Sequence, residues 1–475
     1  MSTTSAITHN TIVQIIGKVI STLLGLVAFS IMAHYLGLEK FGWYITATTY
    51  LQFAGILIDF GITVVTAQML SEPSFEKSTL FKNLFTFRLI TAIICFTIAP
   101  MISLLFPYPL EIKIAIFICS LSFFCPTMNQ VFVGFLQTRL KMYLMVAGEI
   151  LGRIVLVTGL LLLVLNHSDF LPFMWAIVLG ALAYTSVLWL SVSRLTPISL
   201  AFDKNIWIAI VKKMWPITLA VMFNAVYLKS DTVILSFLRP QTEVGIYGAA
   251  YRVIEIYAQV AMLIMGLFLP LLAFNWSRGI KEEFKQYYQM SFDLIMIVAW
   301  PVLVFTIIFG TQIMTLIAGD QFATSGTPLK ILSLAVFGLY LGAIFGHTAI
   351  AINRQRQTMW IYLSTAVITL FGYLIFIPRF GLYGAAWMTV FSEVYTGLML
   401  FFLVHRYSQT TLSYKNFGKI IIAGLILSLC LWPIRNFPIF LPIILAPILY
   451  LIIIIGLKIV SKETIATIVN LKKTT

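Results

Sequence analysis

Charged residues are scarce in this sequence. Asp, Glu, Lys and Arg make up 10% of its 475 residues, and hydrophobic residues make up 60%. Soluble globular proteins contain about 25% charged residues, so this composition excludes that class. A membrane-spanning helix needs about 20 mostly apolar residues. About fourteen segments qualify, so we expect an all-α polytopic membrane protein with spans at approximately 11–34, 42–66, 83–107, 112–136, 142–165, 170–193, 215–238, 245–273, 290–314, 328–352, 358–378, 382–404, 416–434 and 437–459.

Cysteine is also rare, and its spacing predicts no metal centre. Cys95, Cys119, Cys125 and Cys430 all lie inside apolar segments without a metal-type pair. An intramembrane cysteine usually packs as a small hydrophobic side chain. The sequence has no Gly-rich phosphate loop, no His/Cys cluster and no His-Asp-Ser arrangement with local support. We therefore expect no enzymatic site, no metal and no cofactor.

Long polar segments are missing as well, which excludes a tethered soluble domain. The longest connection, about 194–214, includes FDKNIWIAIVKKMW, which mixes apolar and basic residues as an interfacial amphipathic helix does. The net charge of +14 lies mostly in short connections and not on one soluble face, so no nucleic-acid partner is expected. The first ten residues, MSTTSAITHN, lack the basic region of a cleaved signal peptide, so the first span is expected to be retained.

Lys and Arg are distributed unevenly between the two sides of the predicted membrane. With a cytoplasmic N-terminus, twenty of the 31 lie on the cytoplasmic side, six lie on the opposite side and five lie within spans. Cytoplasmic connections retain an excess of Lys and Arg in membrane proteins. This bias supports the even number of spans and predicts that both termini are cytoplasmic.

A short motif recurs at the start of several spans. Phe41-Gly42-Trp43-Tyr44 opens the second span, and Val244-Gly245-Ile246-Tyr247 opens the eighth. An even separation of six spans gives both halves the same orientation, related by a two-fold axis along the membrane normal. A third copy, Phe380-Gly381-Leu382-Tyr383-Gly384, opens the twelfth span. The predicted domains are an N-terminal six-helix lobe at 1–200, a C-terminal six-helix lobe at 201–410, and an additional helix pair with a cytoplasmic tail at 411–475.

The few ionisable residues inside spans are the candidate functional residues. A charge at the bilayer centre costs at least ~2.5 kcal/mol on insertion scales, so such residues are usually functional. Both halves contribute cations, as expected for a water-filled cavity that binds an anion, and Arg matches phosphate oxygens with its planar fork. The candidate substrate-binding cations are Lys18, Arg88, Arg153, Lys229 and Arg252. The candidate coupling or charge-pair residues are Asp59, Glu149, Asp231, Glu255, His347 and Glu393.

Each candidate also has a structural interpretation. Lys18 and Arg88 lie shallow enough to extend to the cytoplasmic interface, and Asp59 can pair with a basic residue or cap a helix break. The deeper charges can form neutral pairs, because Glu149 and Arg153 are spaced i,i+4 and Arg252 and Glu255 are spaced i,i+3.

The titratable residues likewise leave two interpretations open. A lone intramembrane histidine such as His347 can simply be hydrogen-bonded between helices. If His347, Glu393, Glu255 or Asp59 titrates instead, it can couple transport to protons.

The combination of several degenerate motifs resembles a known family. These motifs are Tyr35-Leu36-Gly37, Phe41-Gly42, Leu57-Ile58-Asp59-Phe60-Gly61, Asp231, Val244-Gly245-Ile246-Tyr247, Ala249-Ala250-Tyr251-Arg252 and Gly381-Leu382-Tyr383-Gly384-Ala385-Ala386. Together they resemble the polysaccharide and oligosaccharide-lipid exporters of the multidrug/oligosaccharidyl-lipid/polysaccharide superfamily, above all the Wzx-type O-antigen flippases. The resemblance covers nearly the whole chain in length and layout.

The resemblance implies a specific architecture and activity. Two six-helix lobes would form a V around a central cationic cavity, and alternating access would turn an undecaprenyl-pyrophosphate-linked oligosaccharide across the bacterial inner membrane. A polysaccharide polymerase and a chain-length regulator are further candidate partners. Many such flippases have twelve spans, so residues 416–459 are an addition. In the related lipid II flippases an extra helix pair forms a lipid groove.

Three other functions compete with this interpretation. A multidrug or small-molecule antiporter of the same superfamily would favour acidic cavity residues, whereas here five cations face five acids. A polysaccharide polymerase or ligase would carry a large periplasmic loop, and none is predicted. A receptor or scaffold would not need deep charges in both halves of the chain.

Overall fold

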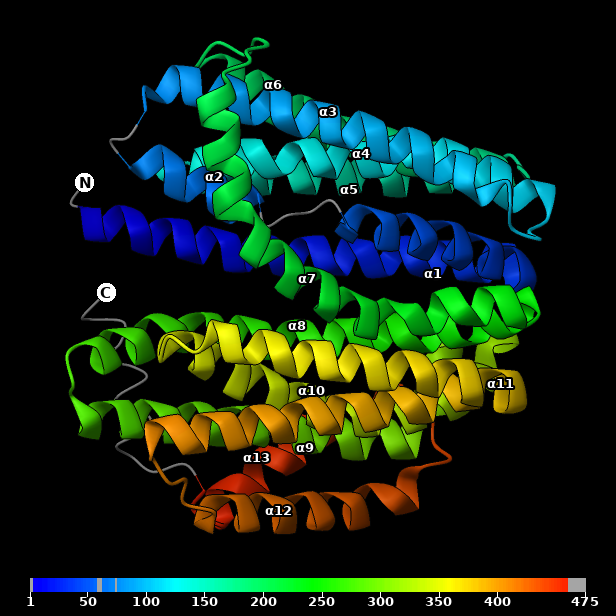
Figure 1. Cartoon of the computed structure of the whole chain (residues 1–475). Coiled ribbons are helices and arrows are strands. Elements are labelled where there is room, and N and C mark those ends of the chain that lie inside the picture. The colour runs from blue at the N-terminus through cyan, green and yellow to red at the C-terminus, as the bar shows by residue number, and fades with distance from the viewer. Residues whose placement is uncertain (1–2, 58–61, 73–74, 460–475) are drawn as a thin grey trace. The chain divides into compact units, whose positions relative to one another are not determined.

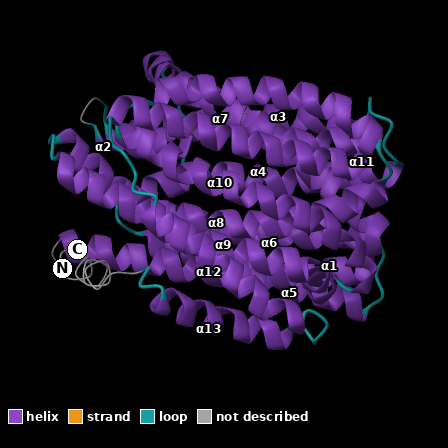
Figure 2. Cartoon of the chain, turned by 90° about the horizontal axis from the view of Figure 1, so that it is seen from below, coloured by secondary structure: helices purple, strands orange, loops and turns teal. Residues whose placement is uncertain are grey.

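The computed structural model describes residues 3–57, 62–72 and 75–459, and nearly all of them are helical (Figure 1). Within these ranges no strand occurs (Figure 2). Hydrocarbon offers no partners to backbone N–H and C=O groups, and a helix satisfies them internally. The predicted all-α polytopic fold is confirmed.

The elements follow one another along the chain with short connections. Their bounds are α1 Thr3–Leu57, α2 Ile62–Ser71, α3 Lys77–Ser103, α4 Leu110–Thr138, α5 Met142–Leu165, α6 Phe170–Ser193, α7 Lys204–Leu238, α8 Gln241–Ser277, α9 Lys281–Ala318, η1 Asp320–Ser325, α10 Gly326–Ala351, α11 Gln355–Ser408, α12 Lys415–Leu431, η2 Trp432–Ile434 and α13 Phe440–Gly456.

Two of these helices, α1 and α11, fold back on themselves and contain two predicted spans each (Figure 1). α1 folds at Gly37, where φ is 70°, and α11 folds at Gly381, where φ is 57°. A residue with a Cβ is strained at such positive φ values, so glycine permits both reversals. Each long helix is therefore a hairpin of two spans.

The helices account for all fourteen predicted spans. Ten described helices are long and apolar enough to cross a membrane by length and composition. α11 supplies two spans, and α1 supplies the first span and most of the second. The two predicted spans that remain, 215–238 and 437–459, correspond to α7 and the shorter apolar helix α13. The chain is therefore a multi-pass membrane protein.

The segment before residue 215, which resembles an interfacial amphipathic helix in composition, is helical. It forms the beginning of α7, which runs from Lys204 to Leu238 without a break. Asp203 starts that helix, because its Oδ1 accepts hydrogen bonds from the backbone N–H groups of Asn205 and Ile206 at 2.8 and 3.2 Å.

The predicted second span, 42–66, is divided between α1 and α2. α1 ends at Leu57 and α2 begins at Ile62. Asp59 lies outside the described residues, and so do residues 460–475 of the predicted tail.

The chain divides into two compact units, Met1–Gly245 and Ile246–Thr475. Unit 1 contains α1 to α7 and the beginning of α8, and within it α4 packs against α1, α3 and α6, while α5 packs against α1 and α6. Unit 2 contains the rest of α8 and α9 to α13, and within it α10 packs against α9 and α11. The predicted lobe boundary at residue 200 falls in the connection before α7.

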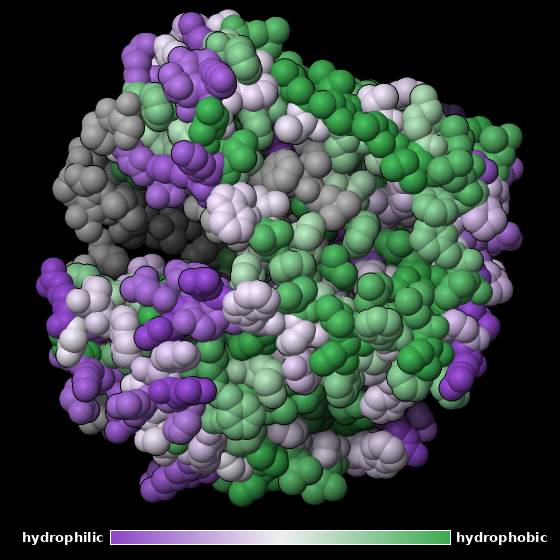
Figure 3. All heavy atoms as spheres, viewed as in Figure 1, coloured by the Kyte–Doolittle hydropathy of each residue, from purple (hydrophilic) through white to green (hydrophobic). Residues whose placement is uncertain are grey.

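Large hydrophobic side chains remain exposed along the helices. Examples are Leu165, Leu429 and Ile455, whose exposed fractions are 74%, 73% and 73%. The space-filling view shows many hydrophobic residues along the helices and hydrophilic residues gathered toward helix ends (Figure 3). In a bilayer such surfaces contact lipid, so their exposure carries no penalty.

The glycines of two copies of the repeated motif lie against each other within unit 1. A Cβ on Gly42 of α1 would lie 1.9 Å from the carbonyl oxygen of Gln241, and a Cβ on Gly245 of α8 would lie 2.2 Å from that of Leu38. Thr46 Oγ1 donates a hydrogen bond of 2.5 Å to the Gln241 side chain. Only residues without a side chain allow two backbones to approach so closely, so packing explains glycine in both motifs.

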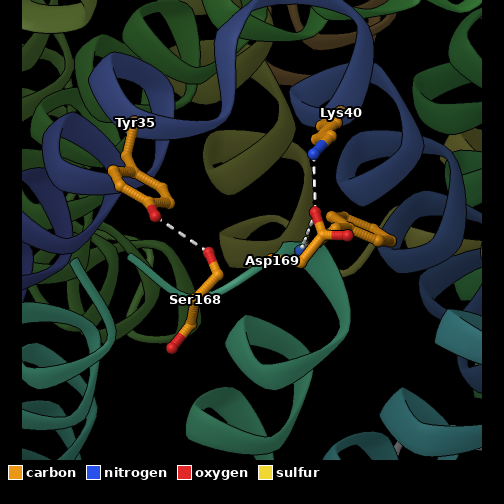
Figure 4. Close-up of polar contacts among 5 residues, drawn as sticks. Tyr35, Lys40, Ser168 and Asp169 are labelled. Carbon is orange, nitrogen blue, oxygen red and sulfur yellow. Dashed lines mark hydrogen bonds and ion pairs between the residues drawn. The ribbon is translucent and has the colours of Figure 1, made fainter. Parts of the chain in front are cut away.

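A polar latch, formed by Tyr35, Lys40, Ser168 and Asp169, holds the Gly37 fold of α1 against the connection between α5 and α6 (Figure 4). Tyr35 Oη donates a hydrogen bond of 2.9 Å to the Ser168 carbonyl oxygen, and Lys40 Nζ lies 2.6 Å from Asp169 Oδ1. The same Oδ1 accepts the backbone N–H of Phe170 at 2.8 Å and caps α6. The hydrogen bonds from Lys40 and Phe170 stabilise the carboxylate and lower the pKa of Asp169.

We predict that Gly42→Ala destabilises the protein by about 1–3 kcal/mol, because the new methyl group meets the backbone at Gln241. Thermal unfolding of the detergent-solubilised protein measures the effect. Gly266→Ala in α8 is the matched control, since nothing lies within 4 Å of a Cβ there. Equal unfolding temperatures for the two variants would contradict the close contact.

We predict that Asp169→Asn lowers thermal stability at pH 7, because Asn retains the helix cap but loses the ion pair with Lys40. The pKa of Asp169 is lowered in the folded state, so the ion pair stabilises above the ordinary aspartate value of ~3.9 and is lost as the pH falls through the lowered pKa. The difference between wild type and variant should be constant from about pH 7 to about pH 5 and shrink toward about pH 3. A difference independent of pH would exclude the ion pair as its cause.

Candidate functional site

Three of the predicted intramembrane charges line one seam between α1 and α5 in unit 1. Lys18 Nζ lies 3.9 Å from Glu149 Oε1, and Ser21 Oγ donates a hydrogen bond of 2.6 Å to the same oxygen. The guanidinium carbon of Arg153 lies 3.8 Å from the position that a Cβ on Gly25 would occupy. Helical spacing places the contributing residues of each helix on one face. We call Lys18, Ser21, Glu149 and Arg153 the α1–α5 charge seam.

The charge seam is accessible and carries a net positive charge. The Lys18 and Glu149 side chains are 45% and 22% exposed, and Arg153 is half-buried. Two cations and one carboxylate leave one positive charge in excess within the seam. An accessible excess of positive charge between membrane-spanning helices suits an anion, and the guanidinium fork of Arg153 suits a phosphate in particular.

Arg88 has different surroundings, although it is predicted with the same group. Its side chain is fully buried. Its Nε on α3 donates a hydrogen bond of 3.0 Å to the Thr127 carbonyl oxygen on α4, and its guanidinium group also donates to the Gln130 side chain. These hydrogen bonds connect α3 to α4 and satisfy a cation that has no exposed surface. Binding of substrate by Arg88 stays a prediction.

Lys229 and Asp231 lie on α7, also in unit 1. Asp231 is 1% exposed, and its Oδ1 accepts a hydrogen bond of 2.6 Å from the backbone N–H of Thr232. Lys229 is half-buried. Residues two apart on a helix do not share a face, so the two side chains point to different surroundings. Asp231 belongs to the interior of the unit, and Lys229 is the more accessible of the two.

Unit 2 contains an ion pair on α8. Arg252 Nη1 lies 2.6 Å from Glu255 Oε2, one turn away on the same face, and the two side chains are 38% and 27% exposed. This is the arrangement that their i,i+3 spacing permits. The pair itself is neutral, so Arg252 would have to share its guanidinium group between Glu255 and an added anion.

Glu393 lies deeper in unit 2, on the second arm of α11, and is 4% exposed. Hydroxyl pairs join the two arms on either side of it, Thr365 with Thr396 at 3.0 Å and Tyr373 with Thr389 at 3.0 Å. The carboxyl group therefore belongs to a polar layer inside unit 2.

His347 on α10 has a local hydrogen-bond partner. Its Nδ1 lies 2.8 Å from the Ala343 carbonyl oxygen, one turn earlier on the same helix. This hydrogen bond is compatible with the structural interpretation of His347. A coupling role for His347 or Glu393 stays a prediction.

Sequence reasoning missed Ser21 and the residues of the polar latch. Ser21 follows Lys18 by three residues, so helical spacing alone could have indicated a shared face. Asp169 directly precedes an apolar run, which is a signal for a helix cap. The pairing of Lys40 with Asp169 has no local signal, because it depends on tertiary structure. Among the described residues, no group of three or more His, Cys, Asp or Glu side chains is arranged to hold a metal ion.

The sequence matches a protein-family model and several curated relatives. The family model for polysaccharide biosynthesis proteins matches residues 7–276, more than half of the chain. The probable low-salt glycan biosynthesis flippase Agl15 of Haloferax volcanii is 21% identical over 198 residues, which are 42% of this chain and 42% of that protein. The matched segments span about 39% to 54% of the curated relatives' own lengths.

Solved structures show the same fold over most of the chain. The lipid II flippase MurJ in an inward closed conformation superposes with a TM-score of 0.78 at 16% identity, covering 92% of this chain and 97% of that one. An inward-facing multidrug resistance MATE family transporter of the MOP superfamily superposes with a TM-score of 0.70 at 14% identity, covering 82% and 94%. The resemblance stated from the sequence motifs is thus confirmed, and the chain belongs to the polysaccharide biosynthesis protein family.

Proposed function

We propose that this protein is a flippase that moves an undecaprenyl-pyrophosphate-linked oligosaccharide across the bacterial inner membrane by alternating access. The α1–α5 charge seam carries this proposal, because it offers an accessible net positive charge between membrane-spanning helices. Membership of the polysaccharide biosynthesis protein family and the likeness to a protein described as a glycan biosynthesis flippase support the substrate class.

The chemistry of such a substrate fits the residues of the seam. A pyrophosphate carries several negative charges and presents oxygens that a planar guanidinium group can bind in pairs. Arg153 would bind these oxygens, and Lys18 would add a point charge that is partly balanced by Glu149. The lipid tail would stay in hydrocarbon throughout, so only the polar headgroup has to be transferred between aqueous sides.

Each unit offers one more accessible cation for an anionic headgroup. Lys229 of α7 in unit 1 and Arg252 of α8 in unit 2 are both half-buried, and neither belongs to the fully buried interior of its unit. We place both termini in the cytoplasm, because twenty of the 31 Lys and Arg residues then lie on that side. A polysaccharide polymerase and a chain-length regulator are candidate partners that would act on the flipped product.

A multidrug or small-molecule antiporter is the second candidate. The likeness to the MATE family transporter favours it, and so does the presence of a carboxylate beside two of the accessible cations, Glu149 beside Lys18 and Glu255 beside Arg252. An exporter of organic cations would depend on these carboxylates and not on the cations. Charge-removing substitutions can therefore separate the two functions.

We predict that Arg153→Gln lowers the amount of surface polysaccharide roughly tenfold or more when it replaces the wild type in a deletion strain. The reason is that the seam loses the guanidinium group that would bind the anion. Glu149→Gln should retain export, since it removes the negative charge and leaves the seam more positive. Surface polymer is measured after the amount of each variant in the membrane has been matched. Arg278→Ala is the control cation, because Arg278 stacks on Phe274 at a helix end, 4.1 Å from the ring centroid.

The outcomes of this comparison separate the interpretations. Equal losses for Arg153→Gln and Glu149→Gln would show that the seam is a structural charge cluster and would reject the anion site. Full activity of Arg153→Gln would reject it as well. Intact polymer in the deletion strain, together with sensitivity to cationic drugs that Glu149→Gln fails to complement, would establish the antiporter.

We also predict that transport depends on the proton gradient through a buried carboxyl group. Glu393 is the strongest candidate, because it is 4% exposed and lies in a polar layer, where a change of charge is costly. The rate at which the lipid-linked oligosaccharide is flipped in proteoliposomes should change by roughly tenfold or more when the imposed pH gradient is reversed. Glu393→Gln should abolish this dependence, whereas Glu283→Gln, at the beginning of α9, should retain it. A wild-type rate that does not change with the pH gradient would exclude proton coupling.

A further inference from the structure

An aromatic groove runs along the α11 hairpin of unit 2, whose two arms are drawn in Figure 1. The first arm contributes Ile368, Gly372, Phe376 and Phe380, which recur every four residues and so share one helix face. The second arm contributes Tyr383, Gly384, Trp387, Met388 and Phe391. The groove has a volume of about 700 Å³, and we call it the α11 groove.

Small residues in the floor bring the two arms of the hairpin together. A Cβ on Gly372 would lie 2.4 Å from Met388 Sδ, and a Cβ on Gly384 would lie 2.4 Å from the Phe376 carbonyl oxygen. The two backbones therefore approach closely where the aromatic side chains stand on either side. The groove is a built feature of the hairpin and not a gap between loosely packed helices.

The aromatic walls of the groove are exposed. Phe376, Phe380, Trp387 and Phe391 are 43%, 58%, 54% and 49% exposed. Exposed rings on membrane-spanning arms favour contact with hydrocarbon, because they offer no hydrogen bonds to water. From Ile368 to Phe380 an α-helix rises about 18 Å, which is more than half of a typical hydrocarbon core. The groove is therefore long enough to hold a substantial part of a lipid chain.

A cation lies at one end of this apolar groove. Arg379 is exposed at the tip of the hairpin, next to the lining residue Phe380 and two residues before the fold at Gly381. The predicted orientation places this tip on the side opposite the cytoplasm. The groove therefore combines an apolar channel for a hydrocarbon chain with a positive charge at the membrane surface, where the phosphate of a lipid lies.

We propose that the α11 groove binds the isoprenoid chain of a polyprenyl phosphate lipid, with its phosphate at Arg379. The inference rests on the proposed flippase function, which supplies a lipid of this class on the outer leaflet. The single groove between the two aromatic walls suits one hydrocarbon chain, as a polyprenyl phosphate has, and the charge of Arg379 is complementary to its phosphate. The groove then guides the tail of the product while its headgroup leaves the protein.

Photo-crosslinking tests this proposal. The full-length protein is placed in vesicles of phosphatidylethanolamine and phosphatidylglycerol with a diazirine-bearing polyprenyl phosphate, and labelled peptides are mapped after irradiation. Labels should concentrate between residues 368 and 391. The double variant Phe376→Ala/Trp387→Ala should reduce labelling there about tenfold, because both walls lose an aromatic ring. Labels spread evenly over the exposed helices would overturn the proposal.

Matched variants control for general effects on folding and lipid contact. Phe371→Ala/Phe402→Ala removes one exposed aromatic ring from each arm outside the groove and should leave labelling unchanged. Arg379→Gln should reduce labelling by the phosphate probe about fivefold but not labelling by an uncharged polyprenol probe. Arg435→Gln is the control. Arg435 is also an exposed cation, but it lies in the connection between α12 and α13, where it stacks on Trp432 at 4.3 Å from the ring centroid.

Two further comparisons identify the occupant and separate this proposal from the flippase function. Undecaprenyl phosphate should compete with the probe at lower concentrations than phosphatidylglycerol does, and equal competition would make the groove a phospholipid site and overturn the proposal. Arg153→Gln, which is expected to lose transport, should be labelled as the wild type is. A variant that loses transport but keeps labelling therefore has a defect in the charge seam. A variant that loses labelling but keeps transport has a defect in the α11 groove.

Discussion

The cost of placing charge in hydrocarbon governs the placement of the polar groups in this protein. A chain that is 60% hydrophobic can insert many helices, but every ionised side chain within them needs a partner or water. The structure uses three solutions. Arg88 is buried and hydrogen-bonded to α4, Arg252 is paired with Glu255 one turn away, and the α1–α5 charge seam stays accessible. The third solution leaves an excess of positive charge that is accessible, and this accessible excess makes the seam the candidate for binding a ligand.

Helical organisation could be predicted from the sequence because hydropathy is a local property. Each of the fourteen predicted spans has a helical counterpart, and the glycines at 37 and 381 fall between spans that the sequence already separates. The segment before residue 215 has the composition of an interfacial amphipathic helix, and the structure makes it helical and continuous with α7. A basic segment at the start of a long helix and an interfacial helix have the same composition, so this continuity could not be predicted from the sequence.

The candidate site could be predicted only in part, because its residues come from distant parts of the chain. Their identity followed from their rarity, since an ionisable residue inside an apolar span is conspicuous. The pairing of Lys18 with Glu149 could not be predicted, because it depends on the packing of α1 against α5. The same limit applies to Arg88. Its shallow position in the span predicted that the side chain can extend to the cytoplasmic interface, whereas the neighbouring helix α4 buries it.

An amphipathic lipid substrate places two opposite demands on a transporter. Its anionic headgroup needs cations that remain accessible within the membrane, and its tail needs an apolar surface that never leaves hydrocarbon. In the proposed function the charge seam would meet the first demand with Lys18 and Arg153, and the α11 groove would meet the second with its aromatic side chains and with Arg379 at its end. A drug exporter would need only a cavity for its substrate. The aromatic groove has a cation at its end and is separate in sequence from the charge seam. This combination favours a substrate that has both a charged head and a long tail.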